Sequence, residues 1–173
     1  MKEEIINRVT NSVLEVFDLE DYYQEGTRTS IDLKDWLEHE FILREKEFRA
    51  QVKAFNWKQY QNQYVAIYCS NDAIIADWAF MLIALALKPY AKHVSFGTLT
   101  DLETSLYQNT LSGLDITKYQ DKPVIIKGCA KKPVPTSAYI MATNLLQGVA
   151  KSIMFGEACS AVPLFKRTLT DKK

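Results

Sequence analysis

The sequence predicts an α/β protein in which a largely parallel sheet carries helices on its faces, giving three layers. Strand-like and helix-like segments alternate through the second half of the chain, and this alternation is typical of parallel sheets. The 173 residues, 47% of them hydrophobic, are sufficient for a packed core. No linker rich in Pro, Gly or Ser divides the sequence. We therefore expect a single α/β domain over residues 1–173.

The first half of the chain predicts short elements followed by one long helix. Residues 3–10 have the apolar spacing of a short amphipathic helix, and residues 13–19 have the β-branched, alternating pattern of a strand. A turn centred on Gly26 follows. Asp32 is a candidate N-cap for a long helix over residues 35–55, in which apolar residues recur at helical spacing.

The second half predicts three strands, each followed by a helix. The strands cover residues 64–69, 93–96 and 123–129, and the helices cover 73–88, a segment opening at Thr100, and a segment from Pro135 or Thr136 to about Phe155. Thr100 and Glu103 have the spacing of a capping box. Gly156 is a candidate C-terminal cap for the last helix.

Two segments of this half resemble each other, one starting at Tyr60 and the other at Tyr119. Each runs through Tyr-Gln, a turn residue, an apolar strand, a cysteine, a polar loop and a helix. Cys69 and Cys129 are 60 positions apart, whereas the Tyr-Gln pairs are 59 apart, so a shift of one residue separates the copies. The pattern indicates a possible internal βα duplication, because repeats of this length mark repeated units, although all βα units share these residue classes.

The charge balance argues against two classes of partner. With 21 basic and 21 acidic residues the formal charge is zero, so no positive field is available to hold nucleic acid or an anionic membrane surface. The longest apolar run, residues 73–91, is interrupted by Asp77, so we expect a buried helix and no membrane span. The N-terminus lacks the features of a secretory signal, which predicts a cytoplasmic location.

The three cysteines, Cys69, Cys129 and Cys159, are the candidate site residues. They form no CxxC pair, and a structural disulfide is not expected in a reducing cytosol. Cys69 and Cys129 each end a predicted strand, so we expect them to face a common pocket at the carboxyl edge of one sheet, where open α/β sheets bind ligands. A thiolate at a helix N-terminus is favoured by the helix dipole and serves as a nucleophile or as a metal ligand.

A metal site would combine these cysteines with a carboxylate. Asp72, three residues after Cys69, is either a helix cap or an oxygen ligand. Glu157 and Cys159 follow the last predicted helix, which should return the chain to the opposite edge of the sheet. A site made of Cys69, Cys129 and Cys159, with Asp72 or Glu157 completing it, therefore requires a returning final segment or a second subunit. Thiolate ligands of this kind favour zinc or iron.

Standard catalytic and nucleotide-binding motifs are absent from the sequence. Residues 39–43, HEFIL, lack the second histidine of HExxH, which excludes a zincin, and no GxGxxG, GxxxxGK[ST] or GxSxG occurs. His93 begins its predicted strand and should lie at the edge opposite Cys69. His39 lies on the charged helix, so neither histidine is well placed for a Cys-His dyad.

Three stretches, YVAIYCSNDAIIADWAFML, VIIKGCAKKPVP and SIMFGEACSAVPLFKR, resemble an uncharacterised bacterial family, domain of unknown function 2480, over nearly the whole chain. The resemblance carries no established chemistry. It implies a small cytoplasmic protein and an association with gene neighbourhoods for iron–sulfur cluster assembly, whose proteins would be partners of the chain.

Three functions remain open at this point. The first is an accessory protein that holds zinc, iron or an iron–sulfur cluster in transit through its cysteines. The second is an enzyme that uses Cys69 or Cys129 as a thiolate nucleophile or sulfur acceptor, with Lys131 or Lys132 favouring the thiolate. The third is an interaction domain in which the cysteines only pack. The sequence leaves the oligomeric state open.

Overall fold

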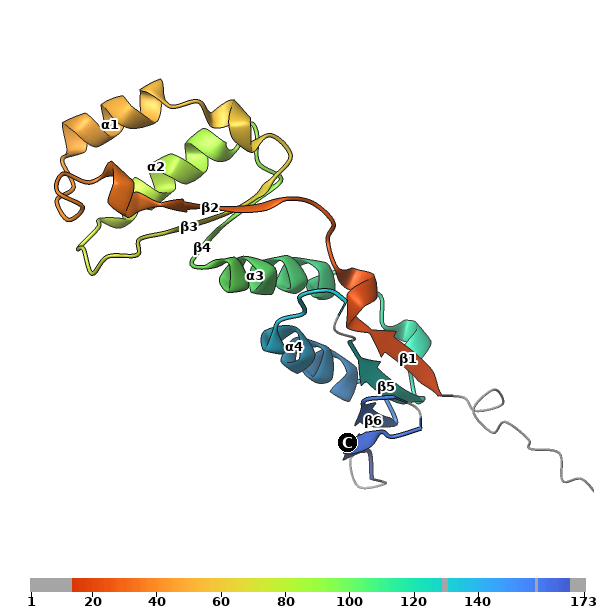
Figure 1. The fold of residues 1–173 in the computed structure, drawn as a ribbon. Helices are drawn as coiled ribbons and strands as arrows, with labels where there is room; N and C mark the ends of the chain where they lie inside the picture. The colour runs from red at the N-terminus through yellow and green to blue at the C-terminus, as the bar shows by residue number, and fades with distance from the viewer. Residues whose placement is uncertain (1–13, 129–130, 158, 169–173) are drawn as a thin grey trace, which may run out of the picture. The chain divides into compact units, whose positions relative to one another are not determined.

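The chain forms two compact units, each with its own sheet (Figure 1). The computed structural model describes residues 14–128, 131–157 and 159–168. Unit 1 combines the chain up to Tyr23 with the chain from Tyr107 onward, and unit 2 is the continuous segment Gln24–Leu106. The single domain over residues 1–173 stays a prediction, because two compact units can belong to one domain or to two. The predicted helix over residues 3–10 lies outside the described residues.

Unit 2 contains a three-stranded, fully parallel sheet in the order β2-β3-β4. Its elements are β2 (Arg28–Asp32), the 3-10 helix η2 (Leu33–Trp36), α1 (Glu45–Ala54), the 3-10 helix η3 (Trp57–Tyr60), β3 (Tyr64–Tyr68), α2 (Asp77–Leu87) and β4 (His93–Phe96). The helix α3 (Leu99–Ser112) begins in this unit and continues into unit 1.

Alternate residues of β3 face two helical layers, because successive strand side chains point to opposite faces of a sheet. Val65 and Ile67 belong to a core cluster with buried residues of α1 and α2. Tyr64 and Ala66 belong to a second cluster, formed with two leucines of α3, Leu102 and Leu106. Unit 2 therefore has three layers, with the helices on both faces of its sheet.

Unit 1 contains a four-stranded sheet in the order β1-β5-β6-β7, in which only the pairing of β6 with β7 is antiparallel. Its elements are β1 (Glu15–Asp18), the 3-10 helix η1 (Leu19–Tyr22), the second half of α3, the 3-10 helix η4 (Thr117–Tyr119), β5 (Pro123–Lys127), α4 (Thr136–Gln147), β6 (Ser152–Phe155) and β7 (Val162–Lys166). The α/β class with mostly parallel strands is confirmed, but the strands are divided between two sheets.

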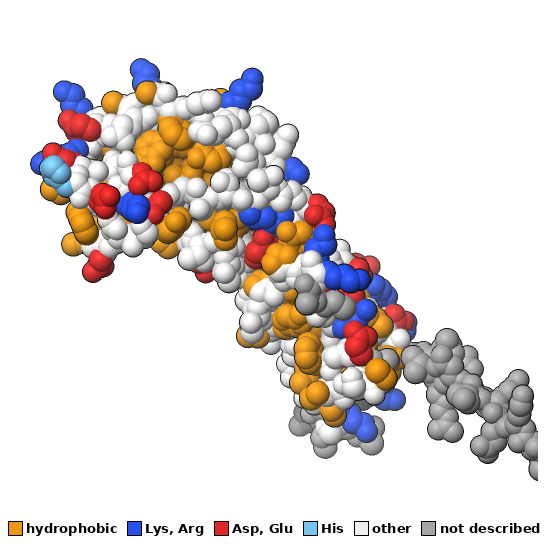
Figure 2. All heavy atoms as spheres, in the orientation of Figure 1, with side chains coloured by type: hydrophobic (Ala, Val, Ile, Leu, Met, Phe, Trp, Pro, Cys, Tyr) orange, Lys and Arg blue, Asp and Glu red, His pale blue; other side chains and the backbone are white. Residues whose placement is uncertain are grey.

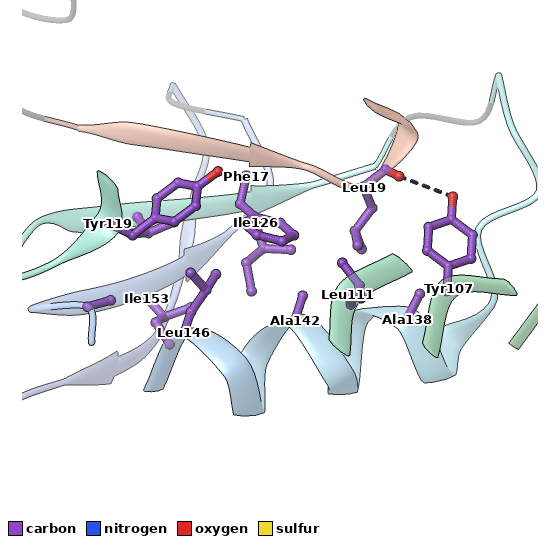
Figure 3. Packing of buried hydrophobic residues seen from close by; sticks show 12 residues of the cluster. Phe17, Leu19, Tyr107, Leu111, Tyr119, Ile126, Ala138, Ala142, Leu146 and Ile153 are labelled. Carbon is purple, nitrogen blue, oxygen red and sulfur yellow. Dashed lines mark hydrogen bonds between the residues drawn. The ribbon is translucent and has the colours of Figure 1, made fainter. Parts of the chain in front are cut away.

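The core of unit 1 lies between its sheet and the helices α3 and α4 (Figure 3). Ala138 and Ala142 on α4 have no exposed surface, and their small side chains allow the helix to approach the strands closely. Tyr107 on α3 is buried, and its hydroxyl donates a hydrogen bond to the carbonyl oxygen of Leu19 at 3.1 Å. This bond satisfies a polar group that would otherwise be costly to bury.

The two units repeat one arrangement of elements, and the internal duplication itself stays a prediction. From Phe48 to Gly97, residues of unit 2 correspond to the described residues 59 positions later in unit 1. The buried residues of the helices correspond in this register: Phe48 with Tyr107, Val52 with Leu111, Ala79 with Ala138, Ile83 with Ala142, and Leu87 with Leu146.

The backbone contacts repeat in the same register. Asn62 and Asp121 both have a positive φ, of 61° and 55°, and each N–H donates to a carbonyl oxygen after the following helix at 2.9 Å. The N–H groups of Gly97 and Gly156 donate to the carbonyl oxygens of Ile67 and Ile126, at 2.9 and 3.1 Å. The two units thus share the same turn conformations and the same backbone hydrogen bonds at equivalent residues.

The first strand of each unit also repeats, but its equivalent residues, such as Asp18 and Asp32, are not 59 positions apart. Asp18 ends β1 and Asp32 ends β2, and each carboxylate accepts a hydrogen bond from the backbone N–H two residues later, at 3.0 and 3.1 Å. The leucines that follow, Leu19 and Leu33, have no exposed surface. The sequence repeat is D-L-x-D followed by Tyr or Trp.

The predicted helix over residues 35–55 is wrong in its first half, because α1 begins at Glu45. His39 and Glu40 have positive φ angles of 53° and 66°, a left-handed conformation that interrupts a helix. Glu38 and Ile42 flank this turn and exchange backbone hydrogen bonds of 2.9 and 3.0 Å. Asp32 caps the short η2 and not a long helix.

Two other predicted helix ends are also wrong. The capping pair of α3 is Thr98 with Asp101, whose carboxylate accepts bonds from the Thr98 N–H and hydroxyl at 2.7 and 2.8 Å, so Thr100 and Glu103 form no capping box. The last predicted helix continues to Phe155, whereas α4 ends at Gln147 and residues 152–155 form β6. Gly156 therefore follows a strand and caps no helix.

Candidate functional site

Cys69 lies at the carboxyl end of β3, in the wall of a pocket of about 530 Å³. The pocket is lined by Cys69, Asn71, Ala73, Ile75, Asp77, Phe80, Met81 and Phe96. These residues come from the loop after β3, the first turns of α2 and the end of β4. Ligands of open α/β sheets bind at this edge, beyond the carboxyl ends of the strands.

The wall of this pocket is mainly apolar. The rings of Phe80 and Phe96 meet edge to face, with their centroids 5.1 Å apart. Met81 and Phe96 remain 64% and 70% exposed, so apolar surface extends from the pocket onto the outside of unit 2. Figure 2 shows hydrophobic side chains, in orange, at the surface of this unit among charged ones. Asp77 is the charged residue in the lining, so the pocket favours a partly apolar ligand that is not an anion.

Asp32 holds the loop that carries Cys69. Its carboxylate accepts the backbone N–H of Ser70 at 3.0 Å in addition to the N–H of Lys34. Burial acts to raise the pKa of Asp32, but the hydrogen bonds from Ser70 and Lys34 outweigh it, and the pKa is lowered below its usual value. The ionised carboxylate of Asp32 therefore holds the backbone of Ser70, the residue after Cys69, in place. The thiol of Cys69 is half-buried and packs against the core of unit 2.

Asp72 does not cap a helix, which was one of the two roles that the sequence allowed. The N-cap position of α2 is Ala76, and no side chain caps the helix. Asp72 is exposed and does not line the pocket. The neighbouring Asn71 instead ties the loop to the turn before α1, because its amide donates to the Glu40 carbonyl oxygen at 3.0 Å.

Glu157 and Cys159 lie in the turn between β6 and β7, and both are exposed. The expectation that they sit at the amino edge of the sheet is wrong, because the segment before them is the parallel strand β6 and not a helix. They follow the carboxyl end of β6, the same edge at which β5 ends. A site containing Glu157 and Cys159 required a final segment that runs back along the sheet, and β6 is that segment.

The expectation that Cys69 and Cys129 follow strands of one sheet is wrong. β3 and β5 belong to different sheets. The constant register of 59 also pairs Cys69 with Gly128, so the matching cysteines 60 positions apart are not equivalent. Cys129 itself lies outside the described residues. The following residues, Lys131 and Lys132, donate their backbone N–H groups to the Glu20 carboxylate at 3.0 and 3.3 Å.

The family model for proteins of unknown function (DUF2480) matches residues 3–167, nearly the whole chain. The chain belongs to the DUF2480 family. No curated protein and no solved structure gives a significant match to this DUF2480 chain. The resemblance of its three sequence blocks is thereby confirmed, and the family description assigns no chemistry, so functional proposals depend on the geometry.

The described residues of the DUF2480 chain include no group of three His, Cys, Asp or Glu side chains that could hold a metal ion. Of the predicted ligands, Cys69 and Asp72 belong to unit 2, and Glu157 and Cys159 belong to unit 1. His93 begins β4, at the edge opposite Cys69 as expected, and contacts the Ser105 hydroxyl at 2.8 Å. Burial lowers the pKa of His93 below its usual value.

In the described part of the DUF2480 chain, no helix is long and apolar enough to cross a membrane. The apolar run at residues 73–91 contributes an 11-residue helix, α2, whose buried face packs on the sheet of unit 2. The prediction of a buried helix therefore holds for one face of α2, whereas Met81 and Leu85 on its other side are exposed.

Sequence analysis missed a second pocket of the DUF2480 chain, beside β2. Its volume is about 550 Å³, and its lining includes Asp32, Asp35, Trp36, Phe55 and Tyr60. The apolar spacing over residues 35–55 predicted one long helix that contained both Trp36 and Phe55, so a pocket between these two residues was not expected. The repeat of D-L-x-D before an aromatic residue could have revealed the short turn that carries Trp36.

Proposed function

We propose that this DUF2480 chain is a small-molecule-binding protein whose ligand occupies the Cys69 pocket. The observation that carries the proposal is the position of Cys69: it lines a pocket of about 530 Å³ at the carboxyl edge of a parallel sheet. That volume falls in the range of about 300–1,000 Å³ that is usual for small-molecule sites. The phenyl rings and Met81 would contact an apolar part of the ligand, and Cys69 and Asp77 would contact its polar part.

Binding is favoured over thiolate catalysis by the surroundings of Cys69. A thiolate nucleophile is usually activated by an adjacent base or a nearby cation. The lining residues of this pocket include the carboxylate of Asp77 and no basic side chain. His93 lies at the opposite edge of the sheet. An enzyme using Cys69 is therefore the weaker alternative.

Thiol labelling tests the pocket. We expect N-phenylmaleimide to modify Cys69 at least roughly fivefold faster than iodoacetate does, when each rate is divided by that of N-acetylcysteine amide with the same reagent. The phenyl ring gains from apolar contact, and the Asp77 carboxylate repels the anionic reagent. Mass spectrometry of the digested protein gives the rate at each cysteine separately.

Two matched variants each remove one carboxylate charge. Asp77→Asn removes it from the pocket lining, and the control, Asp72→Asn, removes it from an exposed residue outside the lining. Asp77→Asn should raise the iodoacetate rate at Cys69 roughly fivefold, with little change for N-phenylmaleimide. Asp72→Asn should change both rates less. Equal normalised rates for the two reagents, or a Cys69 that reacts with neither before denaturation, would rule out the pocket as a binding site.

A cysteine-based metal site, with iron–sulfur assembly as its context, is the second candidate. What favours it is the turn after β6, which brings Glu157 and Cys159 to the edge of the unit 1 sheet at which β5 ends. Cys69 and Asp72 belong to unit 2, so this candidate is proposed for the unit 1 residues Glu157 and Cys159. The partners from iron–sulfur assembly and the cytoplasmic location belong to the same proposal.

Elemental analysis tests the metal candidate. Protein purified without oxygen, metal resin or chelator should contain near-stoichiometric zinc or iron if the site exists. Cys159→Ser should then lower the metal content, whereas Cys69→Ser should leave it unchanged. A metal content well below one equivalent would rule out this candidate. Loss of metal in Cys69→Ser alone would place the metal site in unit 2 instead.

A further inference from the structure

The second pocket of unit 2 has the chemistry of a cation site. It is lined by Ser30, Ile31, Asp32, Asp35, Trp36, Gln51, Ala54, Phe55 and Tyr60. Three of these are aromatic, two are carboxylates, and none is Lys, Arg or His. The pocket shares no lining residue with the Cys69 pocket, so it is a separate site.

The aromatic walls are held in place by their neighbours. The rings of Trp36 and Phe55 have centroids 4.8 Å apart at an angle of 56°, and Phe55 and Tyr60 lie 6.3 Å apart. Behind them Trp57 stacks on Trp36 at 5.6 Å. The Trp57 indole N–H donates to the Val52 carbonyl oxygen at 2.8 Å, which fixes this ring. Aromatic faces carry negative potential, so a rigid set of rings attracts a cation.

The carboxylates add formal negative charge at the same place. Asp35 is exposed on η2, and Asp32 ends β2 at the pocket wall. Hydrogen bonds from Ser70 and Lys34 lower the pKa of Asp32 despite its burial, so it is ionised at neutral pH. Lys34 lies between the two acids in sequence and is not part of the lining, so it offsets only part of their charge.

The repeat in unit 1 shows that the fold does not require this pocket. The residues equivalent to Trp36, Phe55, Trp57 and Tyr60 are Tyr22, Leu114, Ile116 and Tyr119. Tyr119 is completely buried, whereas Tyr60 lines a pocket. Asp18, the equivalent of Asp32, is paired with Lys127 at 3.1 Å, and the residue equivalent to Lys127 in unit 2 is Tyr68.

We propose that unit 2 binds a small organic cation with an alkylated ammonium group between Trp36, Phe55 and Tyr60, with Asp32 and Asp35 balancing its charge. Aromatic walls suit a bulky, weakly hydrated cation better than a metal ion, which needs oxygen ligands around it. The volume of about 550 Å³ is sufficient for a small metabolite.

Calorimetric titration of the full chain with choline and with its neutral isostere, 3,3-dimethyl-1-butanol, tests the proposal. Choline should bind roughly tenfold more tightly, because the two differ mainly in charge. Asp35→Asn should weaken choline binding roughly two- to fivefold. The matched control is Asp21→Asn, which removes the equivalent exposed acid of unit 1 and should leave the affinity unchanged. Trp36→Leu should weaken choline binding roughly fivefold or more.

The proposal would be overturned by equal affinity for choline and the alcohol, by no binding of choline, or by equal losses in Asp35→Asn and Asp21→Asn. A trimethyllysine peptide that binds more tightly than choline would assign the pocket to a protein ligand and overturn the small-molecule assignment. Asp35 is exposed, so its variant should keep the melting temperature of the parent and remain informative even if Trp36→Leu fails to fold.

Discussion

Replacing Glu103 with glutamine is expected to lower the free energy of unfolding by about 3–5 kcal/mol, the usual cost of breaking a buried ion pair. The Arg28 guanidinium donates to both oxygens of Glu103, at 2.6 and 3.2 Å. The two side chains are only 12% and 10% exposed. Glutamine keeps the size of Glu103 but removes its charge, so the Arg28 cation stays buried without its counter-ion.

Arg28 cannot easily move to water in this variant. Its guanidinium also donates to the carbonyl oxygen of Gly26 at 2.7 Å and lies 4.9 Å from the ring centroid of Tyr64, which is buried. These contacts hold the cation where Glu103 neutralises it. The expected loss therefore reflects the removal of the Glu103 charge from a buried pair and not a lost surface contact.

Urea denaturation measures this loss, and Glu45→Gln is its control. Glu45 pairs with Arg49 at 2.9 Å on the exposed face of α1, with side chains 64% and 52% exposed. Removal of such a pair should cost no more than about 0.5 kcal/mol. A loss below about 1 kcal/mol in Glu103→Gln would mean that water reaches Arg28 and that the pair is not needed for stability.

Replacing Gly97 with alanine is expected to cost about 2–4 kcal/mol, through backbone strain and a damaged helix cap. Gly97 has a φ of +112°, which side chains rarely allow. A Cβ there would lie 2.5 Å from Oδ2 of Asp101, the carboxylate that caps α3. The substitution therefore strains the end of β4 and displaces the cap in one step.

The repeat supplies graded controls for this substitution. At Gly156, with a φ of +115°, the nearest atom to a Cβ would be the carbonyl oxygen of Ser160 at 3.1 Å, so Gly156→Ala should cost about 1–2 kcal/mol. Gly148 has a φ of −69° and no atom within 4 Å of a Cβ, so Gly148→Ala should be neutral or slightly stabilising. Equal melting temperatures for all three variants would contradict the strain argument.

The strands that apolar runs specify were predicted well. Residues 64–69 and 93–96 were assigned as strands and form β3 and β4. Most residues of β3 are buried, whereas those of β4 are half-buried or exposed. The first part of the helix over residues 35–55 was predicted wrongly. The left-handed turn at His39 and Glu40 is favoured by the bridge between Glu38 and Ile42, which helical periodicity does not report.

The predicted pairing of Cys69 with Cys129 departs from the register of the repeat. Matching Cys69 with Cys129 required a shift of one residue, and in a strand such a shift moves a side chain to the other face. The segments AKHVSFG and AKSIMFG keep the register of 59 without any shift and end at Gly97 and Gly156. This more regular pattern makes Gly97 and Gly156 equivalent and pairs Cys69 with Gly128.

The insertion of unit 2 between β1 and the rest of unit 1 constrains the order in which the chain can fold during synthesis. In unit 2, β2 pairs with a strand that leaves the ribosome shortly afterwards, with Arg28 opposite Tyr64. In unit 1, β1 pairs with β5, and Glu15 lies opposite Val124. The apolar residues of β1 therefore have no β5 strand to pair with until the whole of unit 2 has been translated. Long-range pairing of this kind is slow and exposed to misassociation, so early folding of the inserted unit would shorten the loop that β1 has to close.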